Sequence, residues 1–410
     1  MNLSSIKILL FDGSFKTTAF INRLASGLAE RHEVYIAGFN EELPTRLPNV
    51  NYVPLGSNQN KIRFVKTALY WSWQQRSFMA FVNSFKALLK GDKSSIQQQN
   101  LAAALVHIKP DIIHLQWTSV IPYFESVLRK QEIPVILSQR GFHTNVKPFV
   151  YSENMEYLRE YYPLFAGFHS VSKSVVNNGD KIWHGPSKIN GVVYTGLPLE
   201  EWLFSNGYQK KEQIKILSIG RNHWKKGNDY ALQACKLLKE KGLSFEYTII
   251  GAAGDEELQF LRADLGLEKE VVFLEQVPIG KVKEIMSEAS LLLMPSVEEG
   301  VPNVAVEAMA IGCPVIGFGC DGLPELIENG KEGWLVPVRD VEAMAEAVMR
   351  FREMNLEEIE GIRKNARHKV EIQHSEEGMI SGMERLYIEV LGRFHAEGAE
   401  FSAEYAERNN

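Results

Sequence analysis

Short apolar runs alternate with amphipathic segments along most of the chain, a pattern typical of parallel β-sheets covered by helices on both faces. The strands predicted in the first half are Ile6–Phe11, Val34–Ala37, Asp111–Leu115, Pro134–Ser138 and Phe168–Val171. Those predicted in the second half are Ile214–Ile219, Phe245–Ile250, Val271–Leu274, Leu291–Met294 and Val315–Phe318. Helical patterns at Thr18–Arg31, Ile96–Ile108 and Ser119–Lys130 separate several of these strands. The sequence therefore predicts an α/β protein.

A polar stretch, Ser205–Gln213, interrupts this alternation and marks a boundary between two Rossmann-like domains. The predicted domains are residues 1–203 and 204–375, and 410 residues are enough to give each its own core. Two such domains in one chain suggest a cleft between them, beyond the carboxyl ends of the strands. The last segment, 376–410, holds a helical pattern at Glu376–Phe394 and a polar, acidic tail that we expect to be frayed.

Composition narrows the class of protein further. The net charge of -6 gives no reason to expect nucleic acid binding. Cys235, Cys313 and Cys320 lack metal-ligand spacing and are interpreted as reduced thiols of a cytoplasmic protein. The N-terminus lacks the pattern of a secretory signal, and no stretch approaches the roughly 20 apolar residues that cross a bilayer. Neither export nor integral membrane insertion is indicated.

Two glutamates eight positions apart carry the strongest functional signal. Glu299 lies in the loop that follows the predicted strand Leu291–Met294, and Glu307 lies about one turn into the next helix, which we expect to start at Pro302. The backbone amides of Asn303 and Val304 would begin that helix without backbone acceptors and could bind an anion. Gly300 permits the tight loop between them. An anion site between two carboxylates suits a ligand that joins phosphates to sugars.

Arg221 and Lys226 form a second signal. Arg221 follows a predicted strand directly after Gly220, and Lys226 precedes the next helix. An arginine can bind a phosphate bidentately and a lysine adds a compact positive charge. In isolation, such a pair is more typical of solvated surface cations. Its place on the first strand of the domain that holds the two glutamates favours a phosphate site.

Two further loops allow more than one interpretation. Gly13 and Ser14 lie between the first strand and the first helix, where they could approach a phosphate or sugar, or form an ordinary turn capped by Thr17 or Thr18. Residues 317–322 match the dinucleotide-binding pattern Gly-x-Gly-x-x-Gly. That match falls in the last strand–helix unit of its domain, and Asp340, the nearest suitable acid, begins a helix. We regard a dinucleotide site there as the weaker interpretation.

Several catalytic motifs are missing from the sequence. It contains no Asp-x-Asp, no His-Glu-x-x-His, no P-loop and no Gly-x-Ser-x-Gly. We therefore expect side chains and helix ends, rather than a protein-held metal, to neutralise a diphosphate.

Three linked motifs resemble the family 4 retaining glycosyltransferases of the GT-B fold. They are Gly220-Arg221…Lys226-Gly227, then Glu299-Gly300…Glu307-Ala308, and finally Gly322-Leu323-Pro324-Glu325-Leu326-Ile327. The resemblance is most specific over residues 214–350 and looser before them. It implies two Rossmann-like domains that face a cleft, with the first binding the acceptor, the second binding the nucleotide-sugar, and the final helix crossing back to the first.

The resemblance also implies a role for each matching residue. Arg221 and Lys226 match the diphosphate-binding pair, Glu307 the ribose-binding glutamate and Glu299 the glutamate that faces the donor sugar. The backbone from Gly300 to Val304 lies beside sugar and phosphates in the family. Transfer with retained configuration, assisted by the leaving phosphate, implies no dedicated base and no metal or other cofactor. The implied partners are a UDP- or GDP-sugar and a glycan or lipid-linked acceptor of cell-surface polysaccharide synthesis.

The chain departs from the family mainly on the acceptor side. Arg140 stands where many relatives carry a histidine, and His143 three positions later could take over part of that role. Gln116, beside Trp117, replaces a second common histidine, and Ser14 replaces a common glycine. Trp117, Arg140 and His143 are therefore candidate acceptor contacts, although Trp117 and His143 could equally be packing residues.

A basic and aromatic stretch, residues 61–93, carries a separate signal. Its basic residues are Lys61, Arg63, Lys66, Arg76, Lys86, Lys90 and Lys93, and its aromatic ones are Phe64, Tyr70, Trp71, Trp73, Phe78, Phe81 and Phe85. Such a stretch could lie on the inner face of an anionic membrane or guide an anionic lipid-linked acceptor. The alternative is a helix that packs through its aromatic face and exposes a basic face to water.

Retaining glycosyl transfer is the function that these signals favour. The alternatives are a sugar-nucleotide epimerase or a phosphorylase on the same fold, and a non-catalytic nucleotide-sugar binding protein. The presence of Arg221, Lys226, Glu299 and Glu307 together favours an active enzyme.

Overall fold

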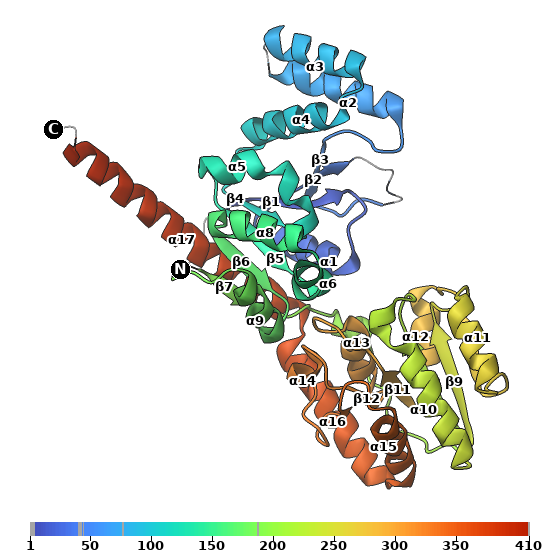
Figure 1. Ribbon diagram of the computed structural model, residues 1–410. Helices are drawn as coiled ribbons and strands as arrows, with labels where there is room; N and C mark the ends of the chain where they lie inside the picture. The colour runs from blue at the N-terminus through green and yellow to red at the C-terminus, as the bar shows by residue number, and fades with distance from the viewer. Residues whose placement is uncertain (1–4, 40–42, 44, 76–77, 187, 409–410) are drawn as a thin grey trace. The chain divides into compact units, whose positions relative to one another are not determined.

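The computed structural model describes residues 5–39, 43, 45–75, 78–186 and 188–408 (Figure 1). The chain divides into two compact units. The first comprises the described residues up to Ser170, Val176–Val193 and the described residues from Met379; the second comprises Val171–Val175 and Tyr194–Gly378. The sequence placed the corresponding boundaries at 203/204 and 375/376.

A seven-stranded sheet forms the centre of the first unit, with the order β3-β2-β1-β4-β5-β6-β7 and parallel pairing throughout. Its strands are β1 (Lys7–Ser14), β2 (Glu33–Phe39), β3 (Val50–Pro54), β4 (Ile112–Leu115), β5 (Val135–Gln139), β6 (Gly167–Ser170) and β7 (Asn190–Val192). The chain reverses its direction across the sheet between β1 and β4. Ligands of open parallel sheets bind at such a point, beyond the carboxyl ends of the strands.

Helices cover both faces of this sheet because successive strand residues point to opposite sides. The helices are α1 (Ala19–Leu28), α2 (Lys61–Gln74), α3 (Phe78–Lys90), α4 (Lys93–Ile108), α5 (Glu125–Lys130), α6 (Gly141–Asn145), α7 (Lys147–Val150), α8 (Ser152–Tyr161), α9 (Lys173–Ile182) and α17 (Glu376–Arg408). Leu9 and Phe11 pack with residues of α4, α5 and α8. Ile8 and Leu10 pack with residues of α1 and α17.

The second unit repeats this design with a six-stranded parallel sheet in the order β10-β9-β8-β11-β12-β13. Its strands are β8 (Ile214–Ile219), β9 (Phe245–Ile250), β10 (Val271–Leu274), β11 (Leu291–Met294), β12 (Val315–Phe318) and β13 (Trp334–Val336). Its α-helices are α10 (Asn228–Glu240), α11 (Glu256–Asp264), α12 (Ile279–Glu288), α13 (Asn303–Ile311), α14 (Leu323–Leu326), α15 (Val341–Glu353) and α16 (Leu356–Gln373). Here the chain reverses its direction between β8 and β11.

The last helix, α17, returns to the first unit, as the sequence predicted. Met383, Leu386 and Val390 lie in the apolar core formed by one face of the first sheet. Tyr387 is fully buried, and its hydroxyl bonds to Nδ1 of His114 on β4 at 2.8 Å. The helix therefore contributes both apolar packing and a buried polar contact.

That contact continues as a chain of hydrogen bonds under the sheet. His114 Nε2 and His169 Nδ1 each bond to the Ser138 hydroxyl at 2.8 Å, and His169 Nε2 bonds to the carbonyl of Val193 at 3.0 Å. Burial lowers the pKa of His169 to about 3 and that of His114 well below its usual value, so both rings are neutral at physiological pH. Because a carbonyl only accepts, His169 donates from Nε2 and Ser138 donates to its Nδ1. His114 then donates to Ser138 and accepts from Tyr387.

Some predicted elements differ from the structure. The helix that the sequence predicted at Glu376–Phe394 extends to Arg408, through a segment rich in alanine and glutamate, which favour helices. The predicted helix Ser119–Lys130 is divided, since Pro122 lies in a 3₁₀ turn, η1 (Thr118–Tyr123), ahead of α5. Strand β1 continues through a register shift to Ser14, where the sequence predicted a loop. The strands β3, β7 and β13 were not predicted.

We expect Tyr387→Phe to destabilise the first unit by about 1–3 kcal/mol, because the buried His114 Nδ1 would lose its donor. Urea unfolding followed by hydrogen exchange of the β4 and β5 amides measures this loss. Tyr151→Phe, at a side chain that is 50% exposed, is the matched control and should change stability by less than about 0.5 kcal/mol. Equal stabilities of the two variants would contradict a stabilising bond between Tyr387 and His114.

Candidate functional site

Two loops of the second unit meet where its sheet reverses direction. The first follows β8 and runs from Gly220 to Gly227, and the second follows β11 and runs from Pro295 to Pro302. Because β8 and β11 are parallel neighbours, both loops lie at the carboxyl edge of the sheet. Of the residues that the sequence selected, they carry Gly220, Arg221, Lys226, Glu299 and Gly300.

Gly227 holds the two loops close together. Its φ is +62°, and a Cβ atom there would lie 2.0 Å from the carbonyl oxygen of Pro295. The amide of Val297 also donates to the carbonyl of Lys225 at 2.8 Å. A side chain at position 227 would therefore force the loops apart, which explains why a glycine follows Lys226.

Two parallel ion pairs join the loops. Lys225 Nζ lies 3.2 Å from Glu298 Oε2, and Lys226 Nζ lies 2.5 Å from Glu299 Oε1. The carboxylates are almost buried, with Glu298 6% and Glu299 8% exposed. A buried pair contributes little net stability, but removal of one partner leaves an uncompensated charge and costs about 3–5 kcal/mol. The pairs therefore fix the positions of both lysines.

Glu299 is oriented from three directions. Its carboxylate accepts from Lys226 and from the Ser296 hydroxyl at 3.1 Å, while its backbone amide donates to Asp321 Oδ2 at 2.9 Å. Asp321 follows β12, so three neighbouring strand ends contribute to this one position. Ser296 and Asp321 were not selected from the sequence.

Two glycines give these side chains room. The Lys226 side chain crosses Gly220, where a Cβ atom would lie 3.0 Å from its Cε. A Cβ atom at Gly322 would lie 1.6 Å from the carbonyl oxygen of Gly300. The absence of both side chains lets the Lys226 stem and the Gly300 loop occupy their positions.

Positive charge gathers around the β8 loop. Partial burial lowers the pKa of His223, and the positive charges of Lys225, Arg221 and Lys226 contribute to the shift, against Glu298. Arg221 is exposed and Lys226 is half-buried. The predicted cationic pair thus lies on one loop, and one of its members contacts the predicted glutamate.

Helix α13 begins beside this cluster. Pro302, the predicted first residue, is its N-cap, so the helix starts one position later, with Asn303 and Val304 as its first two residues. Their amides have no carbonyl one turn earlier to accept from them, so the end of this nine-residue helix carries partial positive charge. Glu307 lies one turn further on and is half-buried. Lysines, helix amides and carboxylates therefore surround one edge of the sheet.

Gly13 and Ser14 belong to the first unit, whereas the other candidate donor-binding residues belong to the second. Gly13 has a φ of +84° at the register shift of β1, and the Ser14 hydroxyl accepts from the amide of Lys16 at 3.1 Å. Thr18 is the N-cap of α1 but makes no capping bond with its side chain, whereas the Thr17 hydroxyl bonds to Asn22. Thr18 therefore occupies the capping position that the alternative predicted, but its side chain does not bond to the backbone amides of α1.

The acceptor-side candidates gather at the carboxyl edge of the first sheet. Trp117 donates from its indole nitrogen to Asp12, and its ring lies 6.2 Å from that of His143. Arg140 is 9% exposed, lies 4.1 Å from the centroid of the Phe20 ring and donates to Gln116 at 3.2 Å. The three predicted residues thus form one cluster, and Asp12 joins it without having been selected from the sequence.

Burial shifts the charges within this cluster. It raises the pKa of Asp12 to about 6, despite the bond from Trp117 and the nearby charge of Arg140. It lowers the pKa of Arg140 to about 9, opposed by the charge of Asp12. Both groups are ionised at pH 7 and compensate each other. Arg140 is therefore an internal cation held by Phe20, Gln116 and Asp12.

The dinucleotide interpretation of residues 317–322 lacks its structural context. That motif needs a long helix directly after the glycine loop, whereas α14 has four residues. Asp340 caps α15 by accepting from the amide of Ala343 at 2.8 Å, as the sequence indicated. Gly322 contacts the Gly300 loop instead, so the third glycine serves loop packing.

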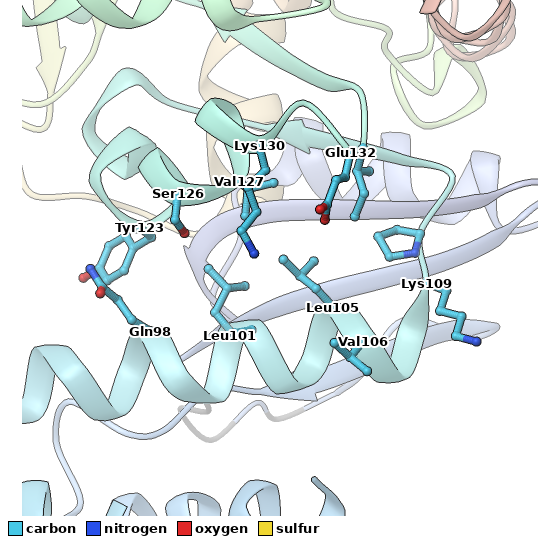
Figure 2. Close-up of a pocket in the computed structure, with 13 residues that line it drawn as sticks. Gln98, Leu101, Leu105, Val106, Lys109, Tyr123, Ser126, Val127, Lys130 and Glu132 are labelled. Atoms are coloured by element: carbon cyan, nitrogen blue, oxygen red, sulfur yellow. The ribbon is translucent and has the colours of Figure 1, made fainter. Parts of the chain in front are cut away.

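A cavity in the first unit lies apart from these residues. It has a volume of about 400 Å³ between α4 and α5, and Figure 2 shows Leu101 and Leu105 pointing from α4 toward Val127. None of the residues selected from the sequence lines it. Among the described residues, no group of three or more His, Cys, Asp or Glu side chains could hold a metal ion.

Other sequence expectations concern the thiols and the membrane. Cys235, Cys313 and Cys320 are free and buried, and burial raises the pKa of each thiol. Within the part of the chain that the structure describes, no helix is both long and apolar enough to cross a membrane.

Comparison with known sequences finds a matching family model and individual relatives. Residues 200–369 match the family described as glycosyl transferases group 1. WcaL of Escherichia coli K12, named for colanic acid biosynthesis, is 38% identical over 165 residues, 38% of this chain and 41% of the relative. AmsK of Erwinia amylovora, named as an amylovoran biosynthesis glycosyltransferase, is 38% identical over 172 residues, 40% of this chain and 42% of the relative. The matched region spans less than half of either relative.

Comparison with solved structures covers nearly the whole chain. Sucrose-phosphate synthase of Thermosynechococcus elongatus has a TM-score of 0.72 at 16% identity, covering 95% of this chain and 100% of its own. HepE of Anabaena, solved with UDP and glucose, has a TM-score of 0.69 at 16% identity, covering 93% and 98%. At this identity the likeness establishes the fold alone, which is the GT-B architecture predicted from the sequence.

Proposed function

The second unit of this chain belongs to the glycosyl transferases group 1 family, and from this premise we propose that the protein transfers a sugar from a nucleotide-sugar to an acceptor hydroxyl. The observation that carries the proposal is the Lys226–Glu299 pair at the point where the sheet reverses direction, beside the start of α13. The names of WcaL and AmsK support a place in cell-surface polysaccharide synthesis. The complex of HepE with UDP and glucose supports a nucleotide-sugar donor.

The leaving diphosphate is the group that this site must stabilise. Cleavage of the bond to the anomeric carbon places negative charge on the departing oxygen and positive charge on the sugar ring. Lys226 and Arg221 supply positive charge, and the Asn303 and Val304 amides supply donors. Preorganised groups of this kind are each worth about 2–4 kcal/mol in the transition state. Because Lys226 is already held by Glu299, little reorganisation accompanies the reaction.

The carboxylates serve the carbohydrate parts of the donor. Glu299 would stabilise the positive sugar ring electrostatically and anchor its hydroxyls, while Glu307 would accept hydrogen bonds from the ribose. We propose transfer with retained configuration, in which the leaving phosphate accepts the proton of the incoming hydroxyl. In this mechanism Glu299 is an anchor rather than a covalent nucleophile, and its Oε1 accepts from both Lys226 and Ser296.

We propose that no metal takes part in the transfer. The cations of the β8 loop and the start of α13 already provide the positive charge that a metal would otherwise supply. The acceptor would be a glycan or a lipid-linked glycan bound by the first unit, with Trp117, Arg140 and His143 as candidate contacts. Gly13 and Ser14 stay candidates for the donor side.

Two other functions use the same donor site. A sugar-nucleotide epimerase or a phosphorylase would need the same phosphate and sugar contacts, and a non-catalytic binder would need only affinity. The presence of Arg221, Lys226, Glu299 and Glu307 together favours catalysis, because a protein that only binds has less need of all four.

The proposal predicts stabilisation by a nucleotide diphosphate and slow donor hydrolysis without an acceptor. We expect UDP or GDP to raise the melting temperature in a thermal-shift panel, and one matching sugar nucleotide to be hydrolysed at a rate unchanged by EDTA. Tight binding without turnover for any acceptor would favour the binder. Loss of activity in EDTA that a divalent metal restores would contradict the metal-free mechanism.

We expect Lys226→Ala to lower turnover by at least about tenfold with the donor concentration saturating, since it removes a charge that acts on the leaving group. Lys225→Ala is the matched control, because it breaks the neighbouring pair with Glu298, whose carboxylate is equally buried. Stopped assays with purified, folded variants measure both rates. Wild-type turnover of Lys226→Ala, or equal losses in the two variants, would overturn the phosphate role.

We expect Glu307→Ala to weaken nucleotide binding by roughly tenfold, the cost of losing hydrogen bonds from hydroxyls to a charged acceptor. Isothermal titration with the nucleoside diphosphate measures the affinity. The deoxyribose form of the same diphosphate serves as the control ligand, because its affinity should change less. An equal loss for both ligands would show that Glu307 acts elsewhere.

A further inference from the structure

Helices α2 and α3 leave large apolar side chains uncovered. Ile62, Trp73, Met79 and Leu89 are 70%, 74%, 67% and 75% exposed, and Phe85 is 51% exposed. Val65, Leu69 and Tyr70 add side chains that are 39–45% exposed. Single exposed apolar residues are ordinary, but a group of them on neighbouring helices marks an interaction surface.

The exposed residues of α2 share one face of the helix. Ile62, Val65, Leu69 and Trp73 recur at intervals of three and four, which places them in one stripe. The opposite face is buried through Thr67, Ala68, Trp71 and Ser72. The apolar stripe is therefore additional to the face that packs α2 onto the first unit.

Helix α3 continues this surface beside α2. Phe85 and Leu89 lie four positions apart, and Ala87 is buried with Ala68 of α2 and Ile96 of α4. Figure 1 shows α2 and α3 next to each other, on the side of α4 away from α5. We call the exposed residues of these two helices the α2–α3 face.

Basic residues border the same face. Lys61, Lys66, Lys86, Lys90 and Lys93 are exposed, and the acidic residue Asp92 is engaged as the N-cap of α4. Arg76 lies outside the described residues, as do the side chains of Phe78 and Phe81. The surface is thus strongly basic on a chain whose net charge is -6.

This arrangement differs from the alternative drawn from the sequence. In that alternative, the aromatic face packs and only the basic face meets water. Trp71 is buried, with 2% exposure, but Trp73 and Phe85 lie outside with the lysines. Apolar and basic side chains therefore share the exposed surface, as in helices that lie at a membrane interface.

A hollow at one end of the face combines the same two properties. It has a volume of about 330 Å³, its walls include Phe64, Val65 and Leu88, and Lys61 and Lys93 lie at its edge. Lys93 Nζ lies 5.8 Å from the centroid of the Phe64 ring. Apolar walls between two ammonium groups fit an acyl chain with a phosphate headgroup.

We propose that the α2–α3 face binds the surface of an anionic lipid bilayer. Trp73, Phe85 and Leu89 enter the boundary between headgroups and acyl chains, and the lysines extend to the lipid phosphates. The charge is what selects a bilayer over a protein partner, because the cores of protein interfaces are depleted in lysine. This inference is independent of glycosyl transfer.

Co-sedimentation of the full chain with vesicles tests the proposal. Vesicles of phosphatidylcholine alone are compared with vesicles that contain phosphatidylglycerol, at low salt and at 0.5 M salt. We expect binding to the anionic vesicles at low salt, with at least tenfold weaker binding to neutral vesicles and at high salt. Equal binding to both vesicles, or binding to neither, would overturn the proposal.

Two sets of variants locate the surface. Trp73→Ser with Leu89→Ser should weaken binding at least tenfold, and Lys86→Ala about fivefold, the factor expected for one lysine near an anionic surface. Phe260→Ser with Ile372→Ser is the matched control, because these side chains are 71% and 65% exposed on the second unit. All of these sites are exposed, so circular dichroism should show folded protein. Unchanged vesicle binding by the first pair, or an equal loss in the control pair, would refute the assignment.

Discussion

The position of one ammonium group determines what the second unit can do. Lys226 lies on a loop after β8, yet its charge is fixed by Glu299 on the loop after β11. That contact requires the loops to approach as closely as Gly227 and Pro295 do, and it requires Gly322 to leave room for the Gly300 carbonyl. The pair therefore depends on three strand ends at once. A carboxylate this buried would be costly alone, so removal of the lysine would leave the charge of Glu299 uncompensated.

In the first unit, buried polar groups attach the last helix to the sheet. Helix α17 begins at Glu376 and must attach to a sheet that the chain left at the end of β7, at Val192. Apolar packing alone specifies the register of such a helix poorly. The neutral histidines His114 and His169 pass hydrogen bonds from Tyr387 to the Val193 carbonyl in one direction. Only one register of α17 places the tyrosine hydroxyl at His114. The buried hydrogen bonds thus fix the register of α17, which the apolar contacts of Leu386 and Val390 alone would leave less well defined.

The sequence predicted the interior of the fold better than its edges. All five strands predicted in the second half match the structure to the residue, because each is rich in β-branched, aromatic or leucine residues, including β10 at a sheet edge. The strands that it missed, β3, β7 and β13, are all at sheet edges. There the chain is short and half-exposed, and residues such as Asn51, Pro54 and Gly191 weaken the strand pattern. The local sequence pattern does not reveal a strand that is held mostly by hydrogen bonds to the neighbouring strand.

For the site, the sequence could select residues but not show how they pair. It placed Arg221, Lys226, Glu299 and Glu307 in the segments that follow β8 and β11, and the structure pairs Lys226 with Glu299. The sequence could not show that Lys226 bonds to Glu299 while Lys225 bonds to Glu298, since that choice depends on the exact approach of two distant loops. Asp12 escaped notice for a similar reason: its partners Trp117 and Arg140 lie more than a hundred positions away. A structure therefore adds most to the sequence at contacts between distant strand ends. In this protein those contacts include the buried charged groups of both units.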